Sequence, residues 1–192
     1  MLAPLAPLAG FMAFWWLSYT LLPEVWIPAG SIAGLLLGLL ADAFLLKRLL
    51  GNIQRLGTVF WVVVFIFYTI GIFGFFMGVP VFNAALAIPA GFVIGDRLAH
   101  AAADQEGLRA AARRTSVFTT GTLALVCTAS ALFALASPST ASDLKGMLGL
   151  PFLVTPAMIW ALILLGGAGL LAVNWALTVL FVRLTYRFLH TT

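Results

Sequence analysis

The sequence predicts an all-α polytopic membrane protein, a single domain over residues 1–192 with six transmembrane helices and both termini in the cytoplasm. Of the 192 residues, 63% are hydrophobic and only 8% are charged, and the mean hydropathy is +1.13. Soluble domains carry about 25% charged residues, so this chain has too few polar side chains to cover a water-facing surface. Its apolar residues also fall into runs close to the roughly 20 residues that cross a bilayer.

The first three predicted spans cover residues 5–22, 26–46 and 56–78. The N-terminal run lacks the positively charged start of a signal peptide, so we expect it to remain as a span. Two basic residues stop the second span, and Gly51-Asn52 is typical of a helix C-cap and turn. The third span is the clearest of the six.

The fourth predicted span, residues 81–95, is short and contains Pro89, which predicts a kink. We expect its helix to continue into the cytoplasm over residues 96–114, before a fifth span over residues 115–135.

An external loop over residues 137–155 follows the fifth span. Thr140 and Asp143 have the spacing of a capping box, which predicts one short helix in the loop. The sixth span begins with Thr155 as N-cap and Pro156 at the first helical position, and nothing stops it until near Leu189.

The basic residues support this topology. With both termini inside, the outer loops hold only Lys145, as the positive-inside rule expects. Trp26 and Trp160 then fall at the outer interface, and Trp61 and Tyr186 at the inner one. The other nine basic residues lie on the inner side: Lys47, Arg48, Arg55, Arg97, Arg109, Arg113, Arg114, Arg183 and Arg187.

Small residues recur every four positions on two predicted spans, and they predict close helix packing. Gly30, Gly34 and Gly38 form overlapping GxxxG motifs, and Gly91 and Gly95 lie on a similar stripe. In lipid, small residues let helices approach closely enough for dispersion contacts. The neighbour is either a helix of the same chain or, as the alternative, a second copy or a membrane partner subunit.

Asp42 is an acidic residue within a span, one to two turns before the basic boundary of the second span. A charge near the bilayer centre costs on the order of 3 kcal/mol and needs a partner. Arg183 and Arg97 lie at comparable depth and are the predicted partners. The alternatives are an ion, proton or substrate contact at Asp42, or a structural salt bridge.

Three further polar side chains in mid-span are candidate substrate-binding residues together with Asp42: Asn83, Asn174 and Tyr68. A buried amide needs a hydrogen-bond partner in hydrocarbon. Bonding between helices is the simpler interpretation, and contact with a solute is the alternative.

Asp96, His100 and Asp104 recur every four residues, so on a continuous helix they share one face. This spacing allows a site for metal or phosphate, or a general acid–base pair. The alternative is a solvated helical extension with i,i+4 pairing.

Two basic pairs, Lys47 with Arg48 and Arg113 with Arg114, are predicted to contact anionic lipid at the inner surface. No basic stripe with interleaved aromatic residues indicates nucleic acid, and no motif indicates a cofactor. Cys127 is the single cysteine, so no disulfide within the chain is expected.

The stretch FFMGVPVFNAALAIPAG, continuing through Gly95 and Arg97, resembles small multi-pass bacterial membrane proteins. The length, the six spans and the inward termini are similar to the substrate-binding subunits of energy-coupling-factor vitamin transporters. In those subunits an Ala-x-x-x-Ala patch on the first helix meets the coupling subunit, and Ala9 and Ala13 have this spacing. The resemblance implies a location in the bacterial plasma membrane.

Three classes of function follow. The leading one is a non-enzymatic protein that binds or moves a small solute, or the membrane subunit of a transporter. The second is a structural or accessory subunit that docks a partner through its glycine stripes. The third is an enzyme at the membrane interface that acts on anionic lipid or phosphate.

Overall fold

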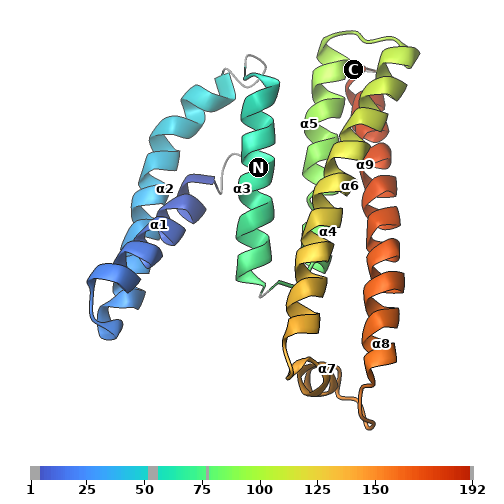
Figure 1. Ribbon diagram of the computed structural model, residues 1–192. Helices are drawn as coiled ribbons and strands as arrows, with labels where there is room; N and C mark the ends of the chain where they lie inside the picture. The colour runs from blue at the N-terminus through green and yellow to red at the C-terminus, as the bar shows by residue number, and fades with distance from the viewer. Residues whose placement is uncertain (1–4, 52–55, 77, 191–192) are drawn as a thin grey trace. The chain divides into compact units, whose positions relative to one another are not determined.

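A computed structural model describes residues 5–51, 56–76 and 78–190, which form helices joined by turns and short loops (Figure 1). The chain divides into two compact units, Met1–Val64 and Phe65–Thr192. The all-helical fold class predicted from the sequence is confirmed for the described residues.

The first unit is built on a pair of helices, α1 (Leu5–Leu21) and α2 (Ile27–Gly51), which lie side by side (Figure 1). The short 3-10 turn η1 (Glu24–Trp26) joins them. The helix α3 (Thr58–Phe75) follows and crosses the boundary between the two units.

The second unit is a bundle of long helices, in which α5 (Ala87–His100), α6 (Gln105–Ala136) and α9 (Gly167–His190) lie side by side (Figure 1). One buried cluster, Leu108, Ala112, Val182 and Tyr186, joins α6 to α9 at one end. A second cluster, which includes Ala84, Leu123 and Val126, lies further along the bundle. The remaining elements are α4 (Val81–Ala84), α7 (Thr140–Leu148), α8 (Pro156–Ala161) and the π-helical segment η3 (Leu162–Gly166).

Five helical segments among the described residues are long and apolar enough to cross a membrane, so the chain has the character of an integral membrane protein. Five of the six predicted spans therefore have a helix of sufficient length. The remaining one, α1, has 17 residues and is about 26 Å long, compared with roughly 30 Å of hydrocarbon. The five segments are Glu24–Asp42, Thr58–Phe75, Val81–His100, Gln105–Ala136 and Pro156–His190.

Within the fourth span, α4 and α5 are separated by Ala85 and Leu86, whose backbone stays right-handed helical but with i→i−3 hydrogen bonds. This irregularity falls one turn before Pro89. Proline has no N–H to donate to the carbonyl of Ala85, and that carbonyl instead accepts from the N–H of Ile88 at 3.1 Å. The predicted disturbance at Pro89 is present as a short change in hydrogen-bonding pattern, and Val81–His100 remains one segment long enough to cross a membrane.

The predicted continuous helix over residues 96–114 was wrong. The helix α5 ends at His100, and the chain reverses through Ala102, whose φ is +48°. The N–H groups of Ala102 and Ala103 return to the carbonyls of Ala99 and Leu98, both at 3.1 Å, which is a Schellman motif. Glycine is the usual residue at this left-handed position after a helix. Because the position is an alanine, the sequence did not indicate that the helix ends there.

Three local predictions about the end of the chain are confirmed. A short helix, α7, lies in the loop. Its N-cap is Ser139, whereas the predicted capping box would have placed Thr140 in that position. Thr155 is the N-cap of α8, and its hydroxyl accepts from the N–H of Met158 at 3.4 Å, with Pro156 at the first helical position. The last helix ends at His190.

Candidate functional site

A ladder of polar side chains lies buried between α6 and α9, in the middle of both long helices. The hydroxyls of Thr119 and Thr178 are 2.9 Å apart. The Thr120 hydroxyl donates to Asn174 Oδ1 at 3.1 Å, and Asn174 Nδ2 donates to the carbonyl of Ala84 at 3.3 Å. Both polar atoms of the Asn174 amide are therefore paired, in a side chain that is only 1% exposed.

Asn83, on α4, is also buried, at 3% exposure, but its hydrogen bonding is incomplete. Its Nδ2 donates to the carbonyl of Thr69 at 2.8 Å. This contact fixes the orientation of the amide, because the reverse orientation would place two oxygens together. Asn83 Oδ1 is then a buried acceptor with no donor among the described residues. In a membrane interior such an unpaired group costs several kcal/mol.

Both asparagines are linked to the short helix α4. Asn83 is on α4 itself, and Asn174 binds the carbonyl of Ala84, the last residue of α4. The change to i→i−3 hydrogen bonding thus begins directly after α4, the helix that carries the buried Asn83 oxygen without a donor among the described residues. Irregular helices with buried polar groups are a common place for substrate and ion sites in membrane transporters.

Two other buried groups lie in the same unit. Tyr68 on α3, predicted as a substrate-binding residue, is 7% exposed, and its ring contacts Phe67 edge-on at 5.7 Å between centroids. Ser116 on α6 is fully buried, and its hydroxyl has no partner among the described residues. The sequence did not distinguish Ser116 from the other hydroxyls of α6.

Asp42 lies on α2 in the first unit and is half-buried. No hydrogen bond or ion pair of its carboxylate occurs among the side chains that the structure describes. Its predicted partners Arg97 and Arg183 belong to the second unit, so the pairing stays a prediction.

The glycine stripe of α2 is covered by α1. A Cβ at Gly34 would lie 2.5 Å from Phe14 Cβ and closer still to the main chain of Gly10. A Cβ at Gly38 would lie 2.5 Å from the Cα of Pro7. A Cβ at Gly30 would overlap the hydroxyl of Ser18. The neighbour of this stripe is therefore a helix of the same chain.

The stripe on α5 faces α9 in the same manner. A Cβ at Gly91 would lie 2.8 Å from Phe181 Cβ and 3.0 Å from the Thr178 carbonyl. A Cβ at Gly95 would lie 2.7 Å from both Thr185 Cβ and the Val182 carbonyl. Side chains larger than hydrogen have no room at either position.

Asp96, His100 and Asp104 do not share a helix face, which corrects the prediction made from their spacing. Asp96 and His100 lie on α5, where His100 Nδ1 is 2.9 Å from the Asp96 carbonyl oxygen and 3.4 Å from its Oδ1. Asp104 is the N-cap of α6 and accepts from the N–H of Gly107 at 2.8 Å. Within the described ranges, no three His, Cys, Asp or Glu side chains converge on a point that could hold a metal.

The predicted lipid-contacting residues are only partly described. Arg113 and Arg114 are exposed on α6 and border a shallow hollow with Ala110 and Val117. The side chains of Lys47 and Arg48 lie outside the described ones.

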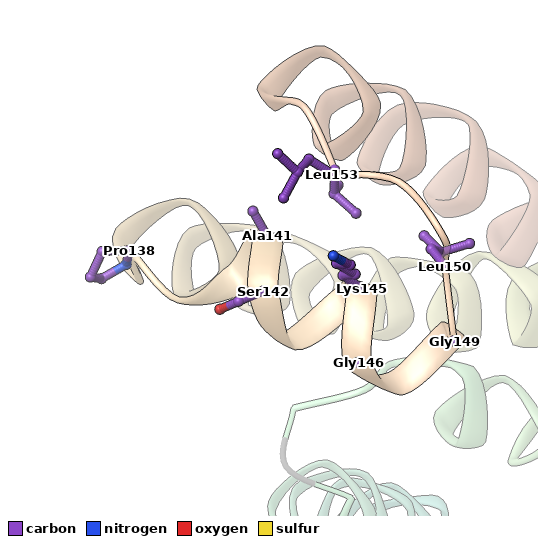
Figure 2. Close-up of a pocket in the computed structure, with 9 residues that line it drawn as sticks. Pro138, Ala141, Ser142, Lys145, Gly146, Gly149, Leu150 and Leu153 are labelled. Atoms are coloured by element: carbon purple, nitrogen blue, oxygen red, sulfur yellow. The ribbon is translucent and has the colours of Figure 1, made fainter.

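Two features of the second unit were missed by the sequence. A hollow of about 570 Å³ lies between α7 and the segment that follows it, and its lining includes Ala141, Lys145, Leu150 and Leu153 (Figure 2). Tyr186, predicted to lie at the inner interface, is 6% exposed, and its hydroxyl donates to the Ala103 carbonyl at 2.5 Å, a contact that was not predicted.

Comparison of the chain with protein-family models, with curated proteins and with solved structures finds no match. The candidate site is therefore defined by its own geometry. Its centre is the two buried asparagines linked to α4: Asn174 is fully paired, and Asn83 has an oxygen without a donor among the described residues.

Proposed function

We propose that the protein is a solute-binding membrane protein, or the solute-binding membrane subunit of a transporter, and that its site lies at Asn83. The observation that carries this proposal is the Asn83 oxygen, which is buried and has no donor among the described residues. Hydrogen bonds from a bound solute would remove the penalty of leaving that acceptor unpaired.

This geometry selects the chemistry of the solute. Asn83 Oδ1 is an acceptor, so the ligand presents an N–H or O–H donor, or is a cation that prefers oxygen ligands. No acidic side chain takes part in the cluster described above, which favours a neutral solute or a single positive charge. Asn174 and the threonines beside it are already paired within the protein and hold the helices together.

We also propose that the chain crosses a bacterial plasma membrane six times, with both termini on the cytoplasmic side. The distribution of nine basic residues on one side and Lys145 on the other supports the orientation. The length of α1 allows it to span where the bilayer thins locally.

Two other classes receive less support. The glycine stripes are covered by helices of the same chain, so they are not open for docking a partner subunit or a second copy. The residues expected to form an enzymatic site lie on separate elements, and one of them caps a helix.

A thermal-shift screen of the purified full-length protein tests the solute-binding proposal. The panel holds sodium and ammonium ions, primary amines, amides, polyols and amino acids. At least one of them is expected to raise the melting temperature saturably, by linkage, and the same solute is expected to have no effect on Asn83→Leu. Failure of every solute on the wild type, or an equal rise in Asn83→Leu, would overturn the proposal.

Cysteine labelling tests the topology separately. In a Cys127→Ser background, a cysteine at Lys145 should react with a membrane-impermeant maleimide in intact cells, whereas one at Glu106 should react only after permeabilisation. Labelling of both, or of Glu106→Cys alone, contradicts the orientation.

A further inference from the structure

A cleft between α6 and α9, separate from the asparagine site, gathers three arginines. Its volume is about 160 Å³, and it is lined by Gln105, Leu108, Arg109, Arg183, Tyr186 and Arg187. The polar members form two i,i+4 pairs, Gln105 with Arg109 on α6 and Arg183 with Arg187 on α9. Side chains four residues apart lie on one helix face, so each helix presents one such pair to the cleft.

Two residues that line the arginine cleft are buried. Leu108 and Tyr186 are 5% and 6% exposed and belong to the same buried cluster. The Tyr186 hydroxyl donates to the Ala103 carbonyl at 2.5 Å. The arginines lie on the helices α6 and α9 that this cluster joins, and not on a loop.

The residues that line the cleft supply no negative charge. None of the six lining residues is acidic, and no ion pair of Arg109 or Arg183 occurs among the described residues. Like charges that converge on one cavity repel each other unless an anion lies between them. Guanidinium groups bind phosphate through paired, charge-assisted hydrogen bonds.

The depth of the cleft suits a phosphate at the membrane surface. Counted from Ala136, about 20 residues of α6 cross the hydrocarbon, so Arg109 lies roughly 10 Å past its edge. Counted in the same way from Pro156 along the antiparallel run, Arg183 lies at the same level. A lipid headgroup and a dissolved phosphate compound can both reach this level.

We propose that the arginine cleft binds a phosphate group through Arg109, Arg183 and Arg187, with Gln105 as an additional donor. The proposal is independent of the solute site at Asn83, because the two sites share no residue. It also differs from the exposed pair Arg113 and Arg114, which borders a different hollow on α6.

Two binding arms distinguish the source of the phosphate. In the first, native mass spectrometry counts phosphatidylglycerol retained by the full-length protein from mixed micelles, with phosphatidylcholine as the neutral reference. In the second, inorganic phosphate is titrated against melting temperature, with sodium chloride at equal ionic strength as the reference. Binding in the first arm alone indicates a lipid, and binding in the second indicates a soluble phosphate; either supports the proposal if it depends on the cleft.

The matched variants are Arg109→Gln/Arg183→Gln and Arg113→Gln/Arg114→Gln, which remove the same charge at neighbouring levels. The cleft variant should weaken binding by about tenfold or more, and the control by about threefold or less. Gln105→Glu is a second cleft variant at an exposed position, where a carboxylate neutralises the arginines without removing them. It should weaken binding in the same arm even if the double variant fails to fold. No preference for phosphate over the reference in either arm, equal losses in the two arginine pairs, or undiminished binding by Gln105→Glu overturns the proposal.

Discussion

In the helix pairs α1–α2 and α5–α9, glycines lie at the point of closest approach, but they contact different groups on the opposite helix. In α1–α2, Gly34 faces the Phe14 side chain and the main-chain carbonyl of another glycine, Gly10. In α5–α9, Gly95 faces Thr185 and the Val182 carbonyl, on a helix that also carries the polar ladder. The same spacing of small residues therefore reports how closely two helices approach, whereas the flanking side chains determine whether the contact only packs or also supports a site.

Among the substitutions that test this comparison, Gly34→Leu should have the largest effect on stability. Since a Cβ alone would already overlap the opposite helix, we expect the free energy of unfolding to fall by about 3 kcal/mol or more. Denaturation of the purified protein in mixed micelles measures the change.

Gly121→Ala is the matched control, because nothing lies within 4 Å of a Cβ built at Gly121. It should leave stability unchanged or raise it by about 0.5–1 kcal/mol. Equal stability of Gly34→Leu and the wild type would contradict the packing described for α1–α2.

Gly95→Ala tests the second pair with a smaller expected effect. Its new Cβ would lie 2.7 Å from the nearest atoms of α9, so the helices must separate slightly, at a cost of about 2 kcal/mol. The same denaturation measurement applies. A loss larger than that of Gly34→Leu would reverse the order of the two pairs.

The polar ladder is tested by a double-mutant cycle with Thr119→Val and Thr178→Val. Hydrogen bonds between membrane helices contribute about 0.6 kcal/mol on average, and the coupling between these two hydroxyls, 2.9 Å apart, should be close to 1 kcal/mol. Additive losses in the double variant would show that the two hydroxyls do not interact.

The smallest expected effect is at the turn after α5. Ala102 has a φ of +48°, which is costly for alanine and free for glycine, so Ala102→Gly should stabilise the protein by about 0.5 kcal/mol net. Ala101→Gly, at a φ of −82°, is the control and should not stabilise. A lower melting temperature for Ala102→Gly than for Ala101→Gly would contradict the left-handed turn.

Much of the helical layout could be predicted from the sequence, because apolar run length and turn residues are local signals. The cap at Thr155 and the disturbance at Pro89 are examples. The turn at Ala102 could not, since alanine favours helix and only tertiary contacts select a positive φ there. Because of this turn, the prediction that Asp96, His100 and Asp104 share one helix face was wrong.

The site was predictable in composition but not in detail. Asn83 and Asn174 were both candidates, and Asn174 was the stronger one because a buried amide needs a partner, but no local pattern predicted which amide would be fully paired. Their difference depends on partners 14 and 90 residues away along the chain, which no local pattern encodes. The arginine cleft likewise arises because two helices distant in sequence present their i,i+4 pairs to each other.

We propose that Asn174 holds the helices together and that Asn83 binds a ligand. The most direct test of this claim compares the unfolding free energies of Asn174→Leu and Asn83→Leu without added solute. Asn174→Leu leaves the Ala84 carbonyl and the Thr120 hydroxyl without their partner, so we expect a loss of about 2 kcal/mol or more. Asn83→Leu removes one hydrogen bond together with an unpaired acceptor, so we expect a change within about 1 kcal/mol of zero. A loss in Asn83→Leu equal to or greater than that in Asn174→Leu would contradict the claim.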